Sequence, residues 1–184
     1  TGSVPMSISG YSWTEERVQN YELSDYYYAG ENETRQALLV KKENADKYTS
    51  PEDLAGQDVG AQNASLQMQL VTEQLTDANP ISIGDITVGV MELKSGNIEA
   101  LAVAYGNAEM IVDANPELTI CTWEFDVKAE YSANVIMMGK GETELLDAVN
   151  ALLAQAKENN LYDGWYKDAV ELAKSENAQE LTLS

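Results

Sequence analysis

The sequence predicts an α/β fold in which short apolar strands alternate with helices. Apolar stretches of strand length recur between helix-start signals from one end of the chain to the other. The 184 residues, of which 44% are hydrophobic, suffice for one large domain or two small ones. Such alternation favours mainly parallel sheets, which bind ligands at the carboxyl ends of their strands.

The expected strands are short and mostly apolar at their centres. They fall at residues 6–9, 36–41, 58–62, 81–83, 98–103, 118–120, 123–127 and 133–138. The stretch at 36–41 is apolar throughout its centre, so we expect it to be buried on both faces.

The expected helices are marked by residues that cap helix ends. Ser12 and Glu15 have the spacing of a capping box, which predicts a helix over residues 12–20. Ser50 followed by Pro51 is typical of a helix start, and a further helix begins at 63–65 and runs to about residue 75. Later helices are expected at 85–93, from 104 to before 116, over 145–156 and from 163 onward.

Composition excludes several classes of function. The net charge of −20 argues against binding to nucleic acid or to anionic membrane surfaces. The chain has no histidine and one cysteine, Cys121, which excludes Ser-His and Cys-His catalysis and the usual zinc sites. No apolar run reaches the length of a membrane span, and we expect no metal or other cofactor.

Two strand-to-helix turns have the composition of anion-binding sites. The first runs from Gly10 to Arg17 and combines a turn glycine, the Ser12 hydroxyl and a guanidinium. The second, at 62–65, offers the Ser65 hydroxyl and the N–H groups of a helix start, which favour anions. On local evidence an ordinary strand–turn–helix with a solvated arginine explains the first turn about equally well, and an ordinary helix cap explains the second, so both readings stay open.

The order of these motifs resembles that of family 3 of the extracellular solute-binding proteins, which bind polar amino acids for ABC importers. Residues 8–17 resemble the family signature G-x-[ST]-x-T-x-E-R at a strand end. The other similar stretches are 23–27, 50–62, 93–100 and 163–166. The resemblance covers nearly the whole chain, with Tyr26 standing where the family usually has proline.

The resemblance implies a type II periplasmic-binding-protein fold of two α/β lobes joined by two crossing segments. Lobe one would comprise residues 1–48 and 128–184, and lobe two residues 49–127. The crossings would lie near 40–48 and 127–133. The family normally has further strands and helices before the stretch that matches this chain's start, so lobe one would lack its N-terminal part. We therefore expect self-association, a swap or weakened ligand binding.

The resemblance also implies roles for residues of the first turn. Arg17 would form a bidentate pair with the α-carboxylate of the ligand, and the Ser12 hydroxyl and backbone would add to it. The Gly10 carbonyl would accept from the α-amino group, and Tyr11 would lie in the same substrate-binding set.

From lobe two, Ser65 and the N–H of Leu66 would close over the same carboxylate, and Gln62 would face the ligand side chain. The family usually has an aspartate for the ligand ammonium after the strand that matches 100–103, where this chain has Ala104 and then Tyr105. The ligand would then lack an α-amino group, find another acid, or bind poorly.

The function implied by the resemblance is that of the substrate-binding component of an ABC importer, without enzymatic activity. Its partners would be a small polar amino acid or related carboxylate and the permease subunits. It would be extracellular, as a cell-surface lipoprotein or in the periplasm. An enzyme of the same fold, similar to cyclic-acid dehydratases, or the ligand-sensing domain of a receptor are the alternatives.

Overall fold

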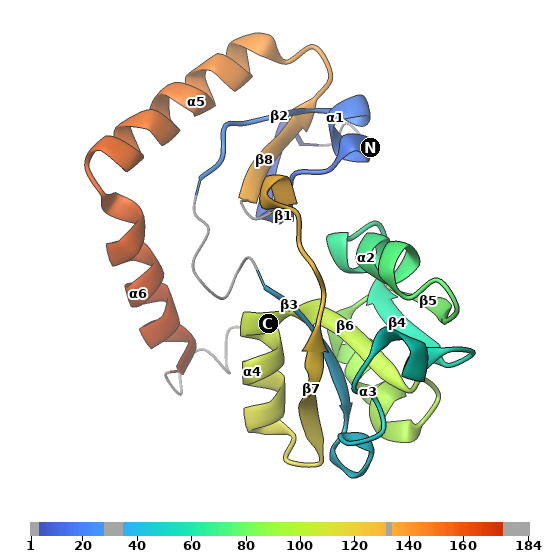
Figure 1. The fold of residues 1–184 in the computed structure, drawn as a ribbon. Helices are drawn as coiled ribbons and strands as arrows, with labels where there is room; N and C mark the ends of the chain where they lie inside the picture. The colour runs from blue at the N-terminus through green and yellow to red at the C-terminus, as the bar shows by residue number, and fades with distance from the viewer. Residues whose placement is uncertain (1–3, 28–34, 132–133, 175–184) are drawn as a thin grey trace.

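The computed structural model describes residues 4–27, 35–131 and 134–174, which form two halves, each built on its own sheet (Figure 1). The first half contains β1 (Met6–Ser12), α1 (Glu15–Asn20), β2 (Tyr21–Leu23), β8 (Asn134–Gly139), α5 (Thr143–Glu158) and α6 (Leu161–Lys174). The second contains β3 (Gln36–Lys41), β4 (Asp58–Gln62), α2 (Leu66–Gln74), β5 (Asn79–Ile83), α3 (Ile86–Ser95), β6 (Ala100–Ala104), α4 (Tyr105–Ala114) and β7 (Leu118–Glu124). Single 3₁₀ turns lie at Lys42–Asn44, Pro51–Leu54 and Ala129–Tyr131. The α/β class is confirmed.

The sheet of the first half has three antiparallel strands in the order β1-β8-β2. Met6 of β1 lies opposite Met138 of β8, and the register shifts between Ser7 and Tyr11. Gly10, inside this irregular stretch, has φ +61°, which a residue with a side chain rarely adopts. The helix α5 covers this sheet: its Val149 and Leu153 form a small core with Ile136 and Met138 of β8.

The sheet of the second half is mixed, with the order β5-β4-β6-β3-β7. Strand β4 is parallel to β5 and β6, whereas β3 is antiparallel to both β6 and β7. The expectation of mainly parallel sheets is therefore wrong. Strand β3 enters this sheet from the first half and not through a crossover helix, so nothing in the local connection requires it to run parallel to its neighbours.

The position of β3 also corrects the expected course of the chain between the halves. The range given to lobe one included residues 36–48, yet β3 pairs with β6 and β7, and Tyr48 is fully buried in the core of the second half. The chain passes from one sheet to the other between β2 and β3, and returns between β7 and β8. The first passage thus precedes residues 40–48, because the apolar strand β3 is buried between β6 and β7 of the second half. The second passage lies near the expected residues 127–133. The division into two lobes with the given bounds stays a prediction.

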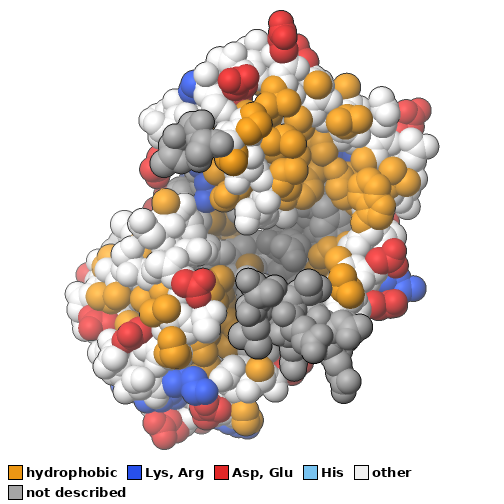
Figure 2. All heavy atoms as spheres, turned by 180° about the vertical axis from the view of Figure 1, so that it is seen from behind, with side chains coloured by type: hydrophobic (Ala, Val, Ile, Leu, Met, Phe, Trp, Pro, Cys, Tyr) orange, Lys and Arg blue, Asp and Glu red, His pale blue; other side chains and the backbone are white. Residues whose placement is uncertain are grey.

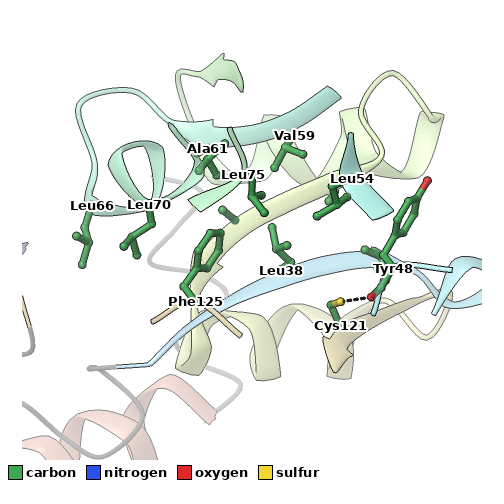
Figure 3. Packing of buried hydrophobic residues seen from close by; sticks show 14 of the residues in the cluster. Leu38, Tyr48, Leu54, Val59, Ala61, Leu66, Leu70, Leu75, Cys121 and Phe125 are labelled. Atoms are coloured by element: carbon green, nitrogen blue, oxygen red, sulfur yellow. Dashed lines mark hydrogen bonds between the residues drawn. The ribbon is translucent and has the colours of Figure 1, made fainter. Parts of the chain in front are cut away.

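The larger core lies between the five-stranded sheet and the elements that pack on it, including α2 (Figure 3). Leu38 and Val59 are fully buried there, as expected for central strands. Cys121 is buried as well, and its thiol donates to the Tyr48 carbonyl at 2.6 Å. Burial raises the pKa of this thiol, so it behaves as a small buried residue and not as a nucleophile.

Helix starts agree with the sequence to within two residues except at α1. Ser65 caps α2, Ser50 and Asp53 form a capping box at the 3₁₀ turn Pro51–Leu54, and Gly96 closes α3 with φ +78°. The helix α1 begins at Glu15, because Thr14 and not Ser12 is its N-cap. The two strand segments expected at 118–120 and 123–127 form the single strand β7. Among the described helices, none combines the length and apolar character needed to cross a bilayer.

Candidate functional site

A cleft of about 1280 Å³ lies between the two halves. One wall is the β1–α1 turn with α1, and the opposite wall is the β4–α2 turn with the first two turns of α2. The carboxyl end of β6, Ala102–Ala104, closes the cleft between them. The two turns with anion-binding composition therefore face each other, and both come directly after strands.

Arg17 reaches across this cleft. Its Nη1 donates to the Ser12 carbonyl at 2.5 Å within its own wall, and its Nη2 donates to the Ala64 carbonyl of the opposite wall at 3.0 Å. The guanidinium also lies 5.3 Å from the centre of the Tyr11 ring. Burial lowers the pKa of Arg17 from its ordinary value, which still leaves the side chain charged at neutral pH.

The first wall is shaped by local chemistry of the turn. The left-handed Gly10 lets β1 bend before α1, and the Thr14 hydroxyl accepts from the Arg17 backbone N–H at 3.2 Å. This cap fixes where α1 begins and therefore which way the Arg17 side chain leaves the helix. Tyr11 is held from behind by a hydrogen bond of 2.9 Å between its hydroxyl and that of Ser7.

The second wall is a helix start. The Ser65 hydroxyl oxygen accepts from the Met68 N–H at 3.1 Å, which leaves its own proton free to donate into the cleft. The first N–H groups of α2, those of Leu66 and Gln67, have no acceptor within the helix. Ala64 has φ +54°, uncommon for a residue with a side chain, and its carbonyl is the group that meets Arg17. Such a wall attracts an anion.

The structure brings together almost all residues expected from the sequence. Those that line the cleft are Gly10, Tyr11, Ser12, Arg17, Gln62, Ser65, Leu66 and Ala104. Tyr105 does not line it, because its ring lies 3.6 Å from the Arg35 guanidinium, which is in turn paired with Glu124. The ligand-binding role of each residue remains a prediction.

Several lining residues were not expected from the sequence. Ala64 was missed because a carbonyl contact leaves no mark on residue type. Gln67 and Asn107 could have been found, since each lies within the first turn of a helix that follows a strand of the cleft. Among the described residues that line the cleft, Arg17 is the only cation. The carboxylates that line the same cleft are those of Glu15, Glu16 and Glu73.

The halves also meet outside the cleft. Trp13 of the first half stacks on Tyr131 of the return passage, with ring centres 6.3 Å apart and planes inclined by 22°. The Tyr131 hydroxyl accepts from Gln69 of α2 at 3.1 Å. Together with the Arg17–Ala64 hydrogen bond, these contacts join the two halves in the described structure.

Two halves joined by two passages, with facing turns in the cleft between them, define the two-lobe class of α/β protein. The chain belongs to the bacterial extracellular solute-binding proteins, family 3, which it matches over residues 1–169. It is 26% identical over 163 residues to a probable histidine-binding protein of Campylobacter jejuni, covering 89% of this chain and 60% of that protein. It is 30% identical over 171 residues to a glutamine-binding protein of an ABC transporter of Bacillus subtilis, covering 90% of this chain and 58% of that protein.

Solved structures give the same result. An amino-acid ABC transporter substrate-binding protein from Streptococcus pneumoniae, bound to L-arginine, superposes with a TM-score of 0.82 at 30% identity, covering 95% of this chain and 71% of that one. An ancestral arginine-binding protein bound to glutamine gives 0.78 at 31% identity, covering 91% and 71%. The resemblance read from the sequence and the two-lobe fold class are confirmed.

The chain spans about 60% of the length of the curated relatives it matches. This agrees with a partial first lobe, in which α5 covers a sheet that has three strands among the described residues. These five relatives are all named as amino-acid-binding proteins, three of them as proteins of ABC transporters, and none is named as an enzyme.

Proposed function

We propose that this chain is the larger part of a substrate-binding component of an ABC importer, and that it binds a small polar amino acid or related carboxylate between its lobes. The observation that carries the proposal is the position of Arg17 between the two walls of the cleft. A carboxylate there would receive the guanidinium fork from one wall and the Ser65 hydroxyl with the N–H of Leu66 from the other. A ligand held by both walls keeps the lobes closed, whereas a ligand held by one does not.

The chemistry of the cleft supports binding without catalysis. Its polar lining consists of hydroxyls, amides and a single guanidinium, together with the three carboxylates. Similar proteins bind arginine or glutamine, and these two amino acids share the α-carboxylate but not the side-chain charge. We place the shared carboxylate at Arg17 and the ligand side chain toward Gln62.

The experiment is isothermal titration calorimetry of the chain with L-arginine, L-glutamine and L-histidine, followed by Arg17→Ala. Hydrogen bonds to a charged group contribute about 1.5–3 kcal/mol each, so the loss of a bidentate pair predicts at least a hundredfold weaker binding. The matched control is Arg35→Ala, which removes the other arginine of the chain, outside the cleft. Unchanged affinity in Arg17→Ala would overturn the proposal, as would the absence of binding by any carboxylate-bearing amino acid.

The family is extracellular by its description. Anchoring of the whole protein to the cell surface as a lipoprotein, and delivery of the ligand to a permease, are parts of the same proposal.

Self-association belongs to the proposal as well, with a second copy of the chain as the partner. Hydrophobic side chains gather on one face of the half that holds the three-stranded sheet (Figure 2). In that half Val4 and Leu152 are each 64% exposed and Ile8 is 56% exposed. Sedimentation velocity over a range of concentrations tests it: a dimer that dissociates on Ile8→Ser supports self-association, and a monomer at all concentrations rules it out.

A further inference from the structure

Gln67 is a polar residue of the cleft whose two amide atoms have different surroundings. Its Nε2 donates to Oε1 of Gln36 at 2.6 Å, and Gln36 is only 3% exposed. Its own Oε1 has no hydrogen-bond partner among the described residues. No buried side-chain nitrogen or oxygen of those residues is without a partner, so this oxygen is open to solvent, and Gln67 lines the cleft.

The place of this oxygen is set by two elements of the second half. Gln67 is the second residue of α2, two positions after Ser65. Its partner Gln36 lies at the start of β3, directly opposite Ala104, the last residue of β6. The Gln36–Gln67 hydrogen bond therefore fixes the Gln67 amide between the helix start and the end of β6, where Ala104 supplies no polar side chain.

On this basis, which rests on the proposed function, we infer that Gln67 is a specificity-determining residue: its Oε1 accepts from the α-ammonium of the ligand, and Gln36 acts as the positioning residue. An amino acid carries its ammonium one carbon from its carboxylate. With the carboxylate at Arg17 and Ser65, the ammonium lies in the cleft between the two walls: the Gly10 carbonyl is its expected acceptor on the first wall, and Gln67 provides one beside the helix start of the second. A neutral amide oxygen accepts from an ammonium without requiring a buried carboxylate.

The carboxylates of the cleft are less suited to this task. Glu73 lies eight residues beyond Ser65 on α2, about 12 Å along the helix axis, and accepts from Gln69. Glu15 and Glu16 are exposed residues in the first turn of α1. None of them is fixed in the cleft by a buried partner, as Gln67 is by Gln36.

The test compares L-arginine, and separately L-glutamine, with the analogue of each that lacks only the α-amino group. Calorimetry gives the ratio of affinities for each pair in the unchanged chain and in its variants. We expect the unchanged chain to prefer the amino acid by roughly ten- to a hundredfold, the range of a hydrogen bond to a charged group. Gln67→Leu should lower the ratio several-fold while the analogue still binds, and Gln36→Leu should lower it part of the way. Gln67→Glu should raise the ratio, because a carboxylate attracts the ammonium more strongly.

The matched control is Gln19→Leu, an exposed glutamine on the opposite wall, which should leave the ratio unchanged. A ratio in Gln67→Leu equal to that of the unchanged chain overturns the inference and leaves the proposed function standing. A ratio that collapses in Glu16→Gln assigns the ammonium to that carboxylate and also overturns it. Failure of the unchanged chain to bind either member of any pair refutes the proposed function itself.

Discussion

The Nη2 of Arg17 donates to the Ala64 carbonyl at 3.0 Å, and this hydrogen bond crosses the cleft from one half of the molecule to the other. The same guanidinium donates to the Ser12 carbonyl of its own wall. A guanidinium has five N–H donors, so donors remain for a carboxylate. Arg17 thus takes part both in the contacts between the two halves and in the proposed ligand site.

Removal of the Arg17 side chain should open the cleft even without ligand. A partly exposed hydrogen bond of this kind contributes about 0.5–1.5 kcal/mol, so Arg17→Ala should shift the balance between closed and open forms roughly two- to tenfold. Small-angle X-ray scattering of the ligand-free chain should show a larger radius of gyration. The control Lys94→Ala removes a cation that pairs with Glu117 far from the cleft. Equal radii for both variants would show that the Arg17–Ala64 contact does not hold the halves together.

Tyr131 should contribute to stability through its ring more than through its hydroxyl. The residue is 6% exposed and stacks on Trp13, while its hydroxyl accepts a hydrogen bond from Gln69. Tyr131→Ala should lower the free energy of unfolding by about 3 kcal/mol or more, and Tyr131→Phe by about 1 kcal/mol. Urea denaturation followed by tryptophan fluorescence measures both. A Phe variant as unstable as the Ala variant would contradict this division.

The core of the five-stranded sheet should be far more sensitive than the surface of α5. Leu38 on β3 is fully buried, so Leu38→Ala should cost about 2–5 kcal/mol of unfolding free energy. Leu152 is 64% exposed, and Leu152→Ala should change it by less than about 0.5 kcal/mol. Chemical denaturation of the pair decides the matter: a similar loss in both variants would mean that a partner covers Leu152 in solution.

Asp53 should make stability depend on pH in the acid range. Hydrogen bonds from the Thr49 and Ser50 backbone N–H groups and hydroxyls hold the pKa of Asp53 below its ordinary value of 3.8. A carboxyl whose pKa is lowered by folding stabilises the folded state above its unfolded pKa, and this contribution disappears as the pH falls through the folded pKa. Asp53→Asn should therefore be less stable at neutral pH, and the difference should shrink below about pH 4. A difference that is the same at neutral and acid pH would argue against these hydrogen bonds.

Elements with local signals were predictable from the sequence. Strand β4 and helix α2 follow an apolar run and a serine cap, and both lie within a residue or two of their expected bounds. The facing turns of the cleft could be predicted for the same reason, since each is a strand end followed by a cap. The start of α1 was misplaced because Ser12 and Thr14 are both good caps and only the bend at Gly10 decides between them.

Features that depend on distant pairing were not predictable. The residues of β3 indicate a buried strand, but its place between β6 and β7 depends on partners 60 to 87 residues away. Residues 36–41 were therefore expected in lobe one, whereas β3 pairs within the sheet of the second half. The Gln36–Gln67 hydrogen bond and the position of Tyr105 under Arg35 depend on the same pairing, which places the start of β3 beside the end of β6.

The central claim is that both walls of the cleft hold one carboxylate, and the most direct measurement compares L-arginine with L-argininamide, which lacks that charge. The affinities are measured by calorimetry at about pH 6, where both compounds carry an α-ammonium. We predict that the unchanged chain binds arginine much more tightly than argininamide. The ratio of the two affinities should fall close to one in Arg17→Ala and take an intermediate value in Ser65→Ala. A preference that persists unchanged in both variants would contradict the account, because the carboxylate would then be bound by other groups.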